Sequence, residues 1–170
     1  MISCGLACKA DIVLYSNGSD LPTDSWWSDV SRQQYIADDF ILNERSQVTT
    51  IKWKGVYGAG VTSDFFEIRI LRDIDPGSDF LFEEVFSVKP AIVSRVDSGL
   101  DLPNGLSVYS YDADVSAEDI FINGNDRLWL NVINETSTSN WAWAGTESGR
   151  AVFSNDLNSW STTMAMLIFD

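Results

Sequence analysis

Residues 128–133 are largely apolar on both faces if the segment is extended, with Asn131 the one polar residue. Successive side chains of a strand point to opposite faces, so Leu128, Leu130 and Val132 would lie opposite Trp129 and Ile133. A short apolar run of this kind is typical of a strand that is covered on both sides. We therefore predict a central strand of a sheet here.

The residues after this segment predict a turn and a second strand. Residues 134–140 are rich in Asn, Ser and Thr, whose side chains bond to nearby backbone and favour turns. Trp141 and Trp143 follow, two residues apart, and would share one face of a strand. We expect the two strands to form a hairpin, with a second sheet packed against it.

The rest of the chain also alternates in short segments, and no window has a convincing helical period. About ten such strands predict an all-β fold, namely a two-sheet antiparallel β-sandwich of jelly-roll type. A length of 170 residues fits a single domain, which we place at residues 11–170. We interpret residues 21–32 as a polar loop. Pro90 should mark the edge of a sheet or a break between strands. The predicted strands are residues 12–15, 35–42, 48–57, 66–71, 80–88, 92–96, 106–111, 120–122, 128–133, 151–153 and 164–169.

The charge and the absence of histidine exclude several classes of function. The chain has 25 acidic and 11 basic residues, a net charge of −14, which would repel nucleic acid and anionic membranes. It contains no histidine, the commonest general base and transition-metal ligand. This argues against a Ser-His-Asp or Cys-His hydrolase and against a catalytic zinc site. No apolar stretch approaches the roughly 18 residues of a membrane span.

Residues 1–10 do not fit the strand pattern. They are small and apolar, and the Ala10–Asp11 junction resembles the end of a signal peptide. We expect either a signal-peptide remnant or a flexible N-terminus. The segment holds Cys4 and Cys8, the only cysteines, as two free thiols or as a disulfide.

Five segments carry a resemblance to a known family: residues 37–42, 50–57, 66–69, 128–132 with Asn134 and Thr136, and 141–144. Together they resemble the β-sandwich domain found in many secreted bacterial proteins, often ones with a C-terminal PEP-CTERM sorting signal. The resemblance implies an extracellular or cell-surface domain associated with exopolysaccharide. It carries over no catalytic residue, and residues up to Asp170 contain no sorting motif.

The seven tryptophans exceed what a core of this size requires. An indole combines a flat apolar face with a polar N–H group, which suits the binding of sugar rings. We expect Trp53 and Trp129 to fill the sandwich, with one of the pair at 141 and 143 as a further candidate, and the others to lie in or beside polar loops. Adjacent residues of an extended chain face opposite ways, so one of the indoles at 26 and 27 should reach the surface or a cleft. The predicted ligand-binding residues are Trp26, Trp27, Trp141, Trp143, Asn140 and Arg150.

Clustered carboxylates raise the question of metal binding. Asp73, Asp75 and Asp79 lie in a predicted turn and could provide oxygen ligands for a structural calcium ion. The spacing departs from that of a helix-flanked calcium loop, because Ser78 stands where that loop requires glycine. Solvated turn carboxylates are the alternative interpretation.

Three functions remain open. The sequence favours a secreted or surface-associated, non-enzymatic β-sandwich that binds carbohydrate or another extracellular polymer through loop aromatics. The alternative is a structural, self-assembling subunit of an extracellular matrix or filament. The third is a glycan-active enzyme, which needs two carboxyl groups flanking a cleft. Sequence alone brings no two of the candidates together, which are Glu67, Glu83, Glu84, Glu118, Glu135 and Glu147.

Overall fold

The computed structural model describes residues 21–58, 64–75, 81–136, 140–146, 151–163 and 166–167. These residues form two large sheets and one small one, and all pairings between the named strands are antiparallel. They contain two short 3-10 helices, η1 (Val30–Arg32) and η2 (Ser116–Glu118), and no α-helix. The predicted two-sheet antiparallel sandwich is therefore confirmed, whereas the jelly-roll connectivity stays a prediction.

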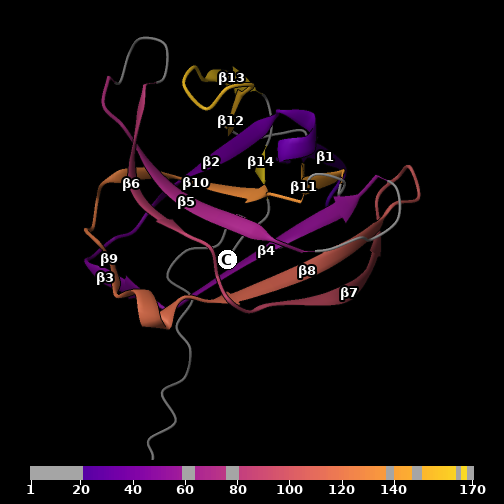
Figure 1. The fold of residues 1–170 in the computed structure, drawn as a ribbon, viewed down its shortest axis with the longest axis horizontal. Helices are drawn as coiled ribbons and strands as arrows, with labels where there is room; N and C mark the ends of the chain where they lie inside the picture. The colour runs from indigo at the N-terminus through magenta and orange to yellow at the C-terminus, as the bar shows by residue number, and fades with distance from the viewer. Residues whose placement is uncertain are drawn as a thin grey trace, which may run out of the picture.

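Sheet A runs in the order β1, β11, β4, β8, β7, and β14 adds to one side of β11. Sheet B runs in the order β13, β12, β2, β10, β5, β6, and a two-stranded sheet joins β3 to β9. Figure 1 shows β2, β10 and β5 crossing one layer while β4, β8 and β7 cross the other. The strands are β1 (Asp24–Trp27), β2 (Tyr35–Ile41), β3 (Ser46–Val48), β4 (Thr50–Tyr57), β5 (Phe66–Asp73), β6 (Phe82–Val88), β7 (Val93–Asp101), β8 (Ser107–Asp114), β9 (Ile120–Ile122), β10 (Arg127–Asn134), β11 (Trp141–Thr146), β12 (Ala151–Ser154), β13 (Ser161–Thr163) and β14 (Met166–Leu167).

The inner core lies between the two sheets. β10 contributes Leu128, Leu130 and Val132, which are buried there, and β2 and β5 flank this strand on either side. The predicted central strand is thus confirmed. Sheet A contributes Trp53 and Tyr111, whose rings stack with centroids 5.3 Å apart.

A smaller apolar cluster covers the outer face of each sheet. The outer cluster of sheet B surrounds Trp129, because alternation sends this residue away from its neighbours on β10. The outer cluster of sheet A comprises Val56, Leu102, Val108, Ala142 and Ala144, with Trp27, Leu100 and Leu106 packed against them. Both sheets therefore bury apolar side chains on two faces.

The predicted hairpin of residues 125–143 is wrong. β10 lies in sheet B and β11 lies in sheet A, so the chain crosses from one sheet to the other between them. The physical reason is that both strands have an apolar face, and each face is buried by pointing into the inner core from opposite sides. Alternation predicts such a face but does not say which sheet will bury it.

The interpretation of residues 21–32 as a polar loop is also wrong, because this segment contains β1 and η1. By contrast, Pro90 lies where the chain passes from β6 to β7, which are edge strands of sheets B and A. The predicted edge or break at Pro90 is confirmed. The predicted strand at 12–15 and the segment 1–10 lie outside the described residues, and of residues 164–169 only Met166–Leu167 is described, as β14.

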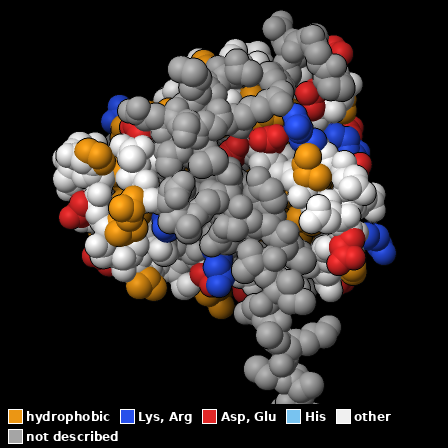
Figure 2. Space-filling view, turned by 180° about the vertical axis from the view of Figure 1, so that it is seen from behind, with side chains coloured by type: hydrophobic (Ala, Val, Ile, Leu, Met, Phe, Trp, Pro, Cys, Tyr) orange, Lys and Arg blue, Asp and Glu red, His pale blue; other side chains and the backbone are white. Residues whose placement is uncertain are grey.

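None of the helices in the described part of the chain has the length and apolar character needed to cross a membrane. Acidic and basic side chains are interspersed where described residues are visible in Figure 2, rather than separated into patches of one sign.

Candidate functional site

The candidate ligand site lies at β1, an edge strand of sheet A. β1 pairs with β11 in a register that places Trp26 opposite Trp143 and Trp27 opposite Ala142. Because alternate side chains face opposite ways, Trp26 packs against the inner core and Trp27 packs on the outer cluster of sheet A. Both indoles are half-buried, and the one that reaches the outer face is Trp27.

Gly58 and Asn140 lie beside the Trp27 ring. A Cβ atom added at Gly58 would be 2.8 Å from Cη2 of Trp27 and 3.6 Å from the carbonyl oxygen of Asn140. That carbonyl accepts a hydrogen bond from the Gly58 N–H at 3.0 Å. The structure therefore brings together two of the predicted ligand-binding residues, Trp27 and Asn140, around a glycine that leaves room for the indole.

The Arg32 guanidinium lies over one face of the Trp27 ring. Its Cζ atom lies 4.7 Å from the ring centroid, which is a cation–π distance. Arg32 is exposed and forms no ion pair among the described residues. We call Trp27, Arg32, Gly58 and Asn140 the Trp27 site.

Asp29 fixes η1, and therefore Arg32, against the sheet. The fully buried Asp29 carboxylate accepts a hydrogen bond from the Ser31 N–H at 2.7 Å, which caps η1. Its second oxygen accepts one from the Trp141 N–H at 2.8 Å. One carboxylate thus ties the β1–β2 connection to the first residue of β11.

The prediction that Trp141 and Trp143 present stacking faces is wrong, because both are fully buried in the inner core. Trp141 lies edge-on to Phe66, with ring centroids 5.1 Å apart. Trp160 is also buried, against Phe82 and the outer cluster of sheet B. Trp53 fills the sandwich as expected, whereas Trp129 is buried in the outer cluster of sheet B, because alternation along β10 turns it away from the inner core.

The remaining predicted residues are only partly described. The Asp73 carboxylate accepts a hydrogen bond from the Asp75 N–H at 3.0 Å, as turn carboxylates do. The described part of the chain gathers no three His, Cys, Asp or Glu side chains that could hold a metal ion. Asp79 and Arg150 lie outside the described residues, so the calcium site and the contribution of Arg150 stay predictions.

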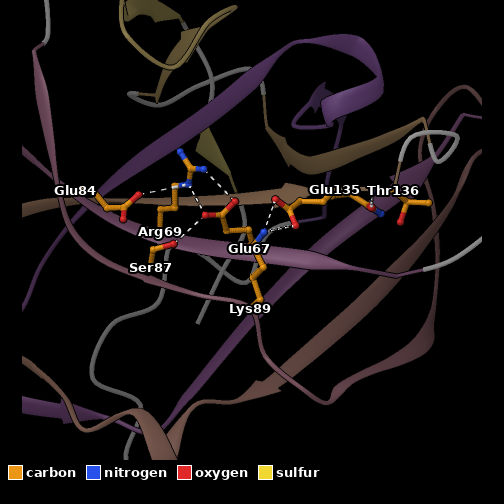
Figure 3. Close-up of polar contacts among 8 residues, drawn as sticks. Glu67, Arg69, Glu84, Ser87, Lys89, Glu135 and Thr136 are labelled. Carbon is orange, nitrogen blue, oxygen red and sulfur yellow. Dashed lines mark hydrogen bonds and ion pairs between the residues drawn. The ribbon is translucent and has the colours of Figure 1, made fainter.

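A second polar group lies on the outer face of sheet B (Figure 3), and we call it the Glu67 network. Arg69 donates two hydrogen bonds of 3.0 Å to the Glu67 carboxylate, one to each oxygen, and Ser87 Oγ donates a third at 2.9 Å. Oε2 of Glu84 lies 3.6 Å from Nε of Arg69, and Lys89 Nζ lies 2.7 Å from Oε2 of Glu135. The network comprises Glu67, Arg69, Glu84, Ser87, Lys89 and Glu135.

The Glu67 network shows which of the glutamates considered for a glycan-active enzyme the fold brings together. Glu67 and Glu135 are near neighbours, with Lys89 beside Glu135 (Figure 3). Burial raises the pKa of Glu67, but hydrogen bonds from Arg69 and Ser87 outweigh that effect and bring the pKa below its usual value. Glu67 is therefore ionised at neutral pH and paired with its own cation, which does not suit a general acid.

Sequence reasoning missed Arg32 and Gly58, and it considered Asp29 only as a hydrogen-bonding group near the indoles, not as the cap of a helical turn. Asp29 two residues before Ser31 is a capping signal that could have placed a helical turn in the segment read as a loop. No local signal connects Gly58 or Arg32 to Trp27, because the contact of Gly58 depends on pairing between distant strands.

Comparisons of the chain with protein-family models, with curated proteins and with solved structures found no match. The fold and site define a two-sheet all-β sandwich with an indole on the outer face of one edge.

Proposed function

We propose that this chain is a secreted or surface-associated, non-enzymatic β-sandwich that binds carbohydrate or a similar extracellular polymer at the Trp27 site. The observation that carries the proposal is the half-buried Trp27 indole on the outer face of an edge strand. Trp26, the other half-buried indole, packs against the inner core instead. The remaining five tryptophans are buried.

The chemistry around Trp27 supports a hydroxyl-rich ligand. An indole supplies a flat apolar surface for the C–H face of a sugar ring once the exposed Arg32 side chain, which lies over the Trp27 ring, turns aside, and its N–H is a hydrogen-bond donor. The Arg32 guanidinium has five N–H donors and no carboxylate partner among the described residues, so its donors are open to ligand oxygens. The net charge of −14 disfavours a polyanion such as nucleic acid.

The paired carboxylates and the absence of histidine support a non-enzymatic function, and the resemblance to a secreted domain supports an extracellular location. The closest carboxylates in the Glu67 network are each neutralised by a basic partner, and the chain has no histidine to act as a general base. The extracellular location rests on the resemblance of residues 37–42, 50–57, 66–69, 128–132 and 141–144 to the secreted bacterial domain.

The test is a polysaccharide array probed with the wild-type chain and with Trp27→Ala and Arg32→Ala. The matched control is Arg45→Ala, because Arg45 also lies over an aromatic ring, Phe121, with its Cζ 4.8 Å from the centroid. We expect binding by the wild type and the control, and loss in both site variants. Equal signals from all four proteins would contradict the proposal, as would an array with no signal.

A second candidate is the structural, self-assembling subunit. It is favoured by exposed aliphatic side chains on edge strands, which include Val85 on β6 and Val96 on β7. Light scattering beside the array separates the two functions: a sugar-dependent signal from a monomer supports binding, and assembly without one supports structure.

A further inference from the structure

We propose that the free edge of β7 pairs with the same edge of a second copy of this chain, antiparallel and with a two-fold axis at Val96. β7 is the last strand of sheet A, and no other strand of the described residues lies on its outer side. Val96 is 64% exposed, and Ile92, just before the strand, is 76% exposed. This surface inference names a partner for the second candidate function and does not depend on carbohydrate binding.

An edge strand offers a row of backbone groups for pairing. In an antiparallel ladder, alternate residues turn their N–H and C=O groups away from the neighbouring strand. On β7 these groups point away from β8, where a further strand can hydrogen-bond to them. A second β7 would join the two copies of sheet A into one continuous sheet.

The sequence around Val96 is complementary to itself in this register. A two-fold axis at Val96 places that residue against its counterpart in the second copy. It also places Arg95 of each copy directly opposite Asp97 of the other. Directly opposite residues of antiparallel strands point to the same side, where opposite charges stabilise the pair and like charges destabilise it. Two Arg95–Asp97 ion pairs would therefore lie on the inner face of sheet A, and the two Val96 side chains would meet on its outer face.

The Arg95 side chain leans away from the free edge, over the rings of Tyr109 on β8 and Tyr57 on β4, so it has to turn towards the second copy to make this contact. Its Nη1 atom lies 2.6 Å from Oδ2 of Asp64, and its guanidinium lies 5.4 Å from the centroid of the Tyr109 ring. Asp97 is paired with Tyr109 on β8, and Arg95 with Tyr111, so both charged residues lie on the same face of sheet A. A guanidinium has five donors, which leaves some for a second carboxylate.

A β-bulge limits the length of the pairing. The register of β7 with β8 shifts between Asp97 and Leu100, and Gly99 has a φ of +72°. A bulge bends and twists its strand, so the regular stretch for pairing ends close to Asp97. The interface is therefore small, in the class below about 1,200 Å² that gives weak and reversible association.

β6, one of the two edge strands of sheet B, is less regular at its centre, because its register with β5 shifts between Ile70 and Leu71. A two-fold axis at Glu84 would place two carboxylates against each other. An axis at Val85 would place Glu84 opposite Phe86 and Glu83 opposite Ser87, with no complementary charge.

The test uses two charge reversals, Arg95→Asp and Asp97→Arg, studied by analytical ultracentrifugation over a range of concentrations. We expect the wild type to form a reversible dimer, and each variant alone to self-associate at least about tenfold more weakly, because like charges then face each other. An equimolar mixture of the two variants should recover the dimer, since positions 95 and 97 are both acidic in the first variant and both basic in the second.

Circular dichroism and thermal melting check that each variant is folded, which matters because Arg95→Asp also removes the ion pair with Asp64. Asp97→Arg leaves that ion pair intact and carries the test if the first variant unfolds. A wild type that stays monomeric at the highest concentration reached would overturn the inference. So would dimers of equal strength in the wild type and in folded Asp97→Arg. If a monomeric variant still binds polysaccharide, binding at the Trp27 site does not require the dimer, and the two proposals are tested independently.

Discussion

The Trp141 indole lies directly over Gly55, so closely that a Cβ atom added at position 55 would be 2.5 Å from Nε1 of Trp141. Gly55 is on β4, and the cross-strand register places Trp141 opposite Tyr57 and Trp143 opposite Gly55. The indole therefore leans diagonally across the pair of strands. A residue without a side chain at position 55 allows this indole to reach the inner core.

We first predict that Gly55→Ala destabilises the fold by about 1–3 kcal/mol, since an extra methyl group in a packed core forces its neighbours to move. Urea unfolding measures the change. In a Trp141→Phe background the same substitution should cost less, because the phenyl ring lacks the atoms nearest to the added methyl group. Equal costs in the two backgrounds would show that the indole is not the cause.

A second prediction concerns Asp29, whose carboxylate bonds to the N–H groups of Ser31 and Trp141. Asp29→Ala leaves these donors without that acceptor and should cost roughly 1–3 kcal/mol in the free energy of unfolding. Asp24→Ala is the matched control, because within the described part of the chain the Asp24 carboxylate accepts only a local hydrogen bond from Ser25 N–H. The control should change stability by no more than about 0.5 kcal/mol. Similar losses in both variants would contradict the bridging role of Asp29.

The pH dependence of stability tests the Glu67 network. The folded-state pKa of Glu67 is lowered, so its contribution is present above the unfolded-state pKa, near 4.5, and is lost as pH falls through the folded-state pKa. Melting temperatures measured from pH 7 down to about pH 3 should therefore fall less steeply for Glu67→Gln than for the wild type. In Arg69→Gln the contribution of Glu67 to stability should change in the opposite direction as pH falls. Burial then raises the pKa of Glu67, and protonation relieves a carboxylate that has lost its basic partner. Parallel profiles for all three proteins would remove Glu67 from the account of acid stability.

The strands were predictable where alternation is strong. Residues 35–42, 66–71 and 128–133 correspond to β2, β5 and β10, since a period of two follows directly from strand geometry. Sheet membership was not predictable, and β10 and β11 are the example. Both have an apolar face, and only long-range pairing decides which sheet each strand joins.

The site was predicted in part for the same reason. The adjacency of Trp26 and Trp27 correctly indicated that one indole would face outward. Trp141 and Trp143 were misjudged because nearness to a polar turn in sequence is not exposure. The signal that points to burial is Trp-Ala-Trp-Ala at 141–144, where small residues on one face and indoles on the other fit a packed strand. Arg32 and Gly58 could not be assigned to the site, because the fold alone brings them to Trp27.

We propose that an outward-facing indole, and not a buried one, carries binding. The free energies of unfolding of Trp27→Ala and Trp141→Ala test whether Trp27 lies outside the core. Removing the buried Trp141 indole should cost roughly 3–5 kcal/mol through lost burial and the cavity left behind. Removing the half-buried Trp27 indole should cost clearly less and leave a cooperative melting transition. Equal losses of stability would place Trp27 in the core instead.

The most direct measurement is affinity electrophoresis of folded Trp27→Ala in gels that contain the polysaccharide bound by the wild type on the array. Retardation of the wild type gives the dissociation constant, and melting of the same samples confirms that the variant is folded. We predict that Trp27→Ala binds at least about tenfold more weakly, a loss of about 1.4 kcal/mol. A folded Trp27→Ala variant that is retarded as strongly as the wild type would contradict the account.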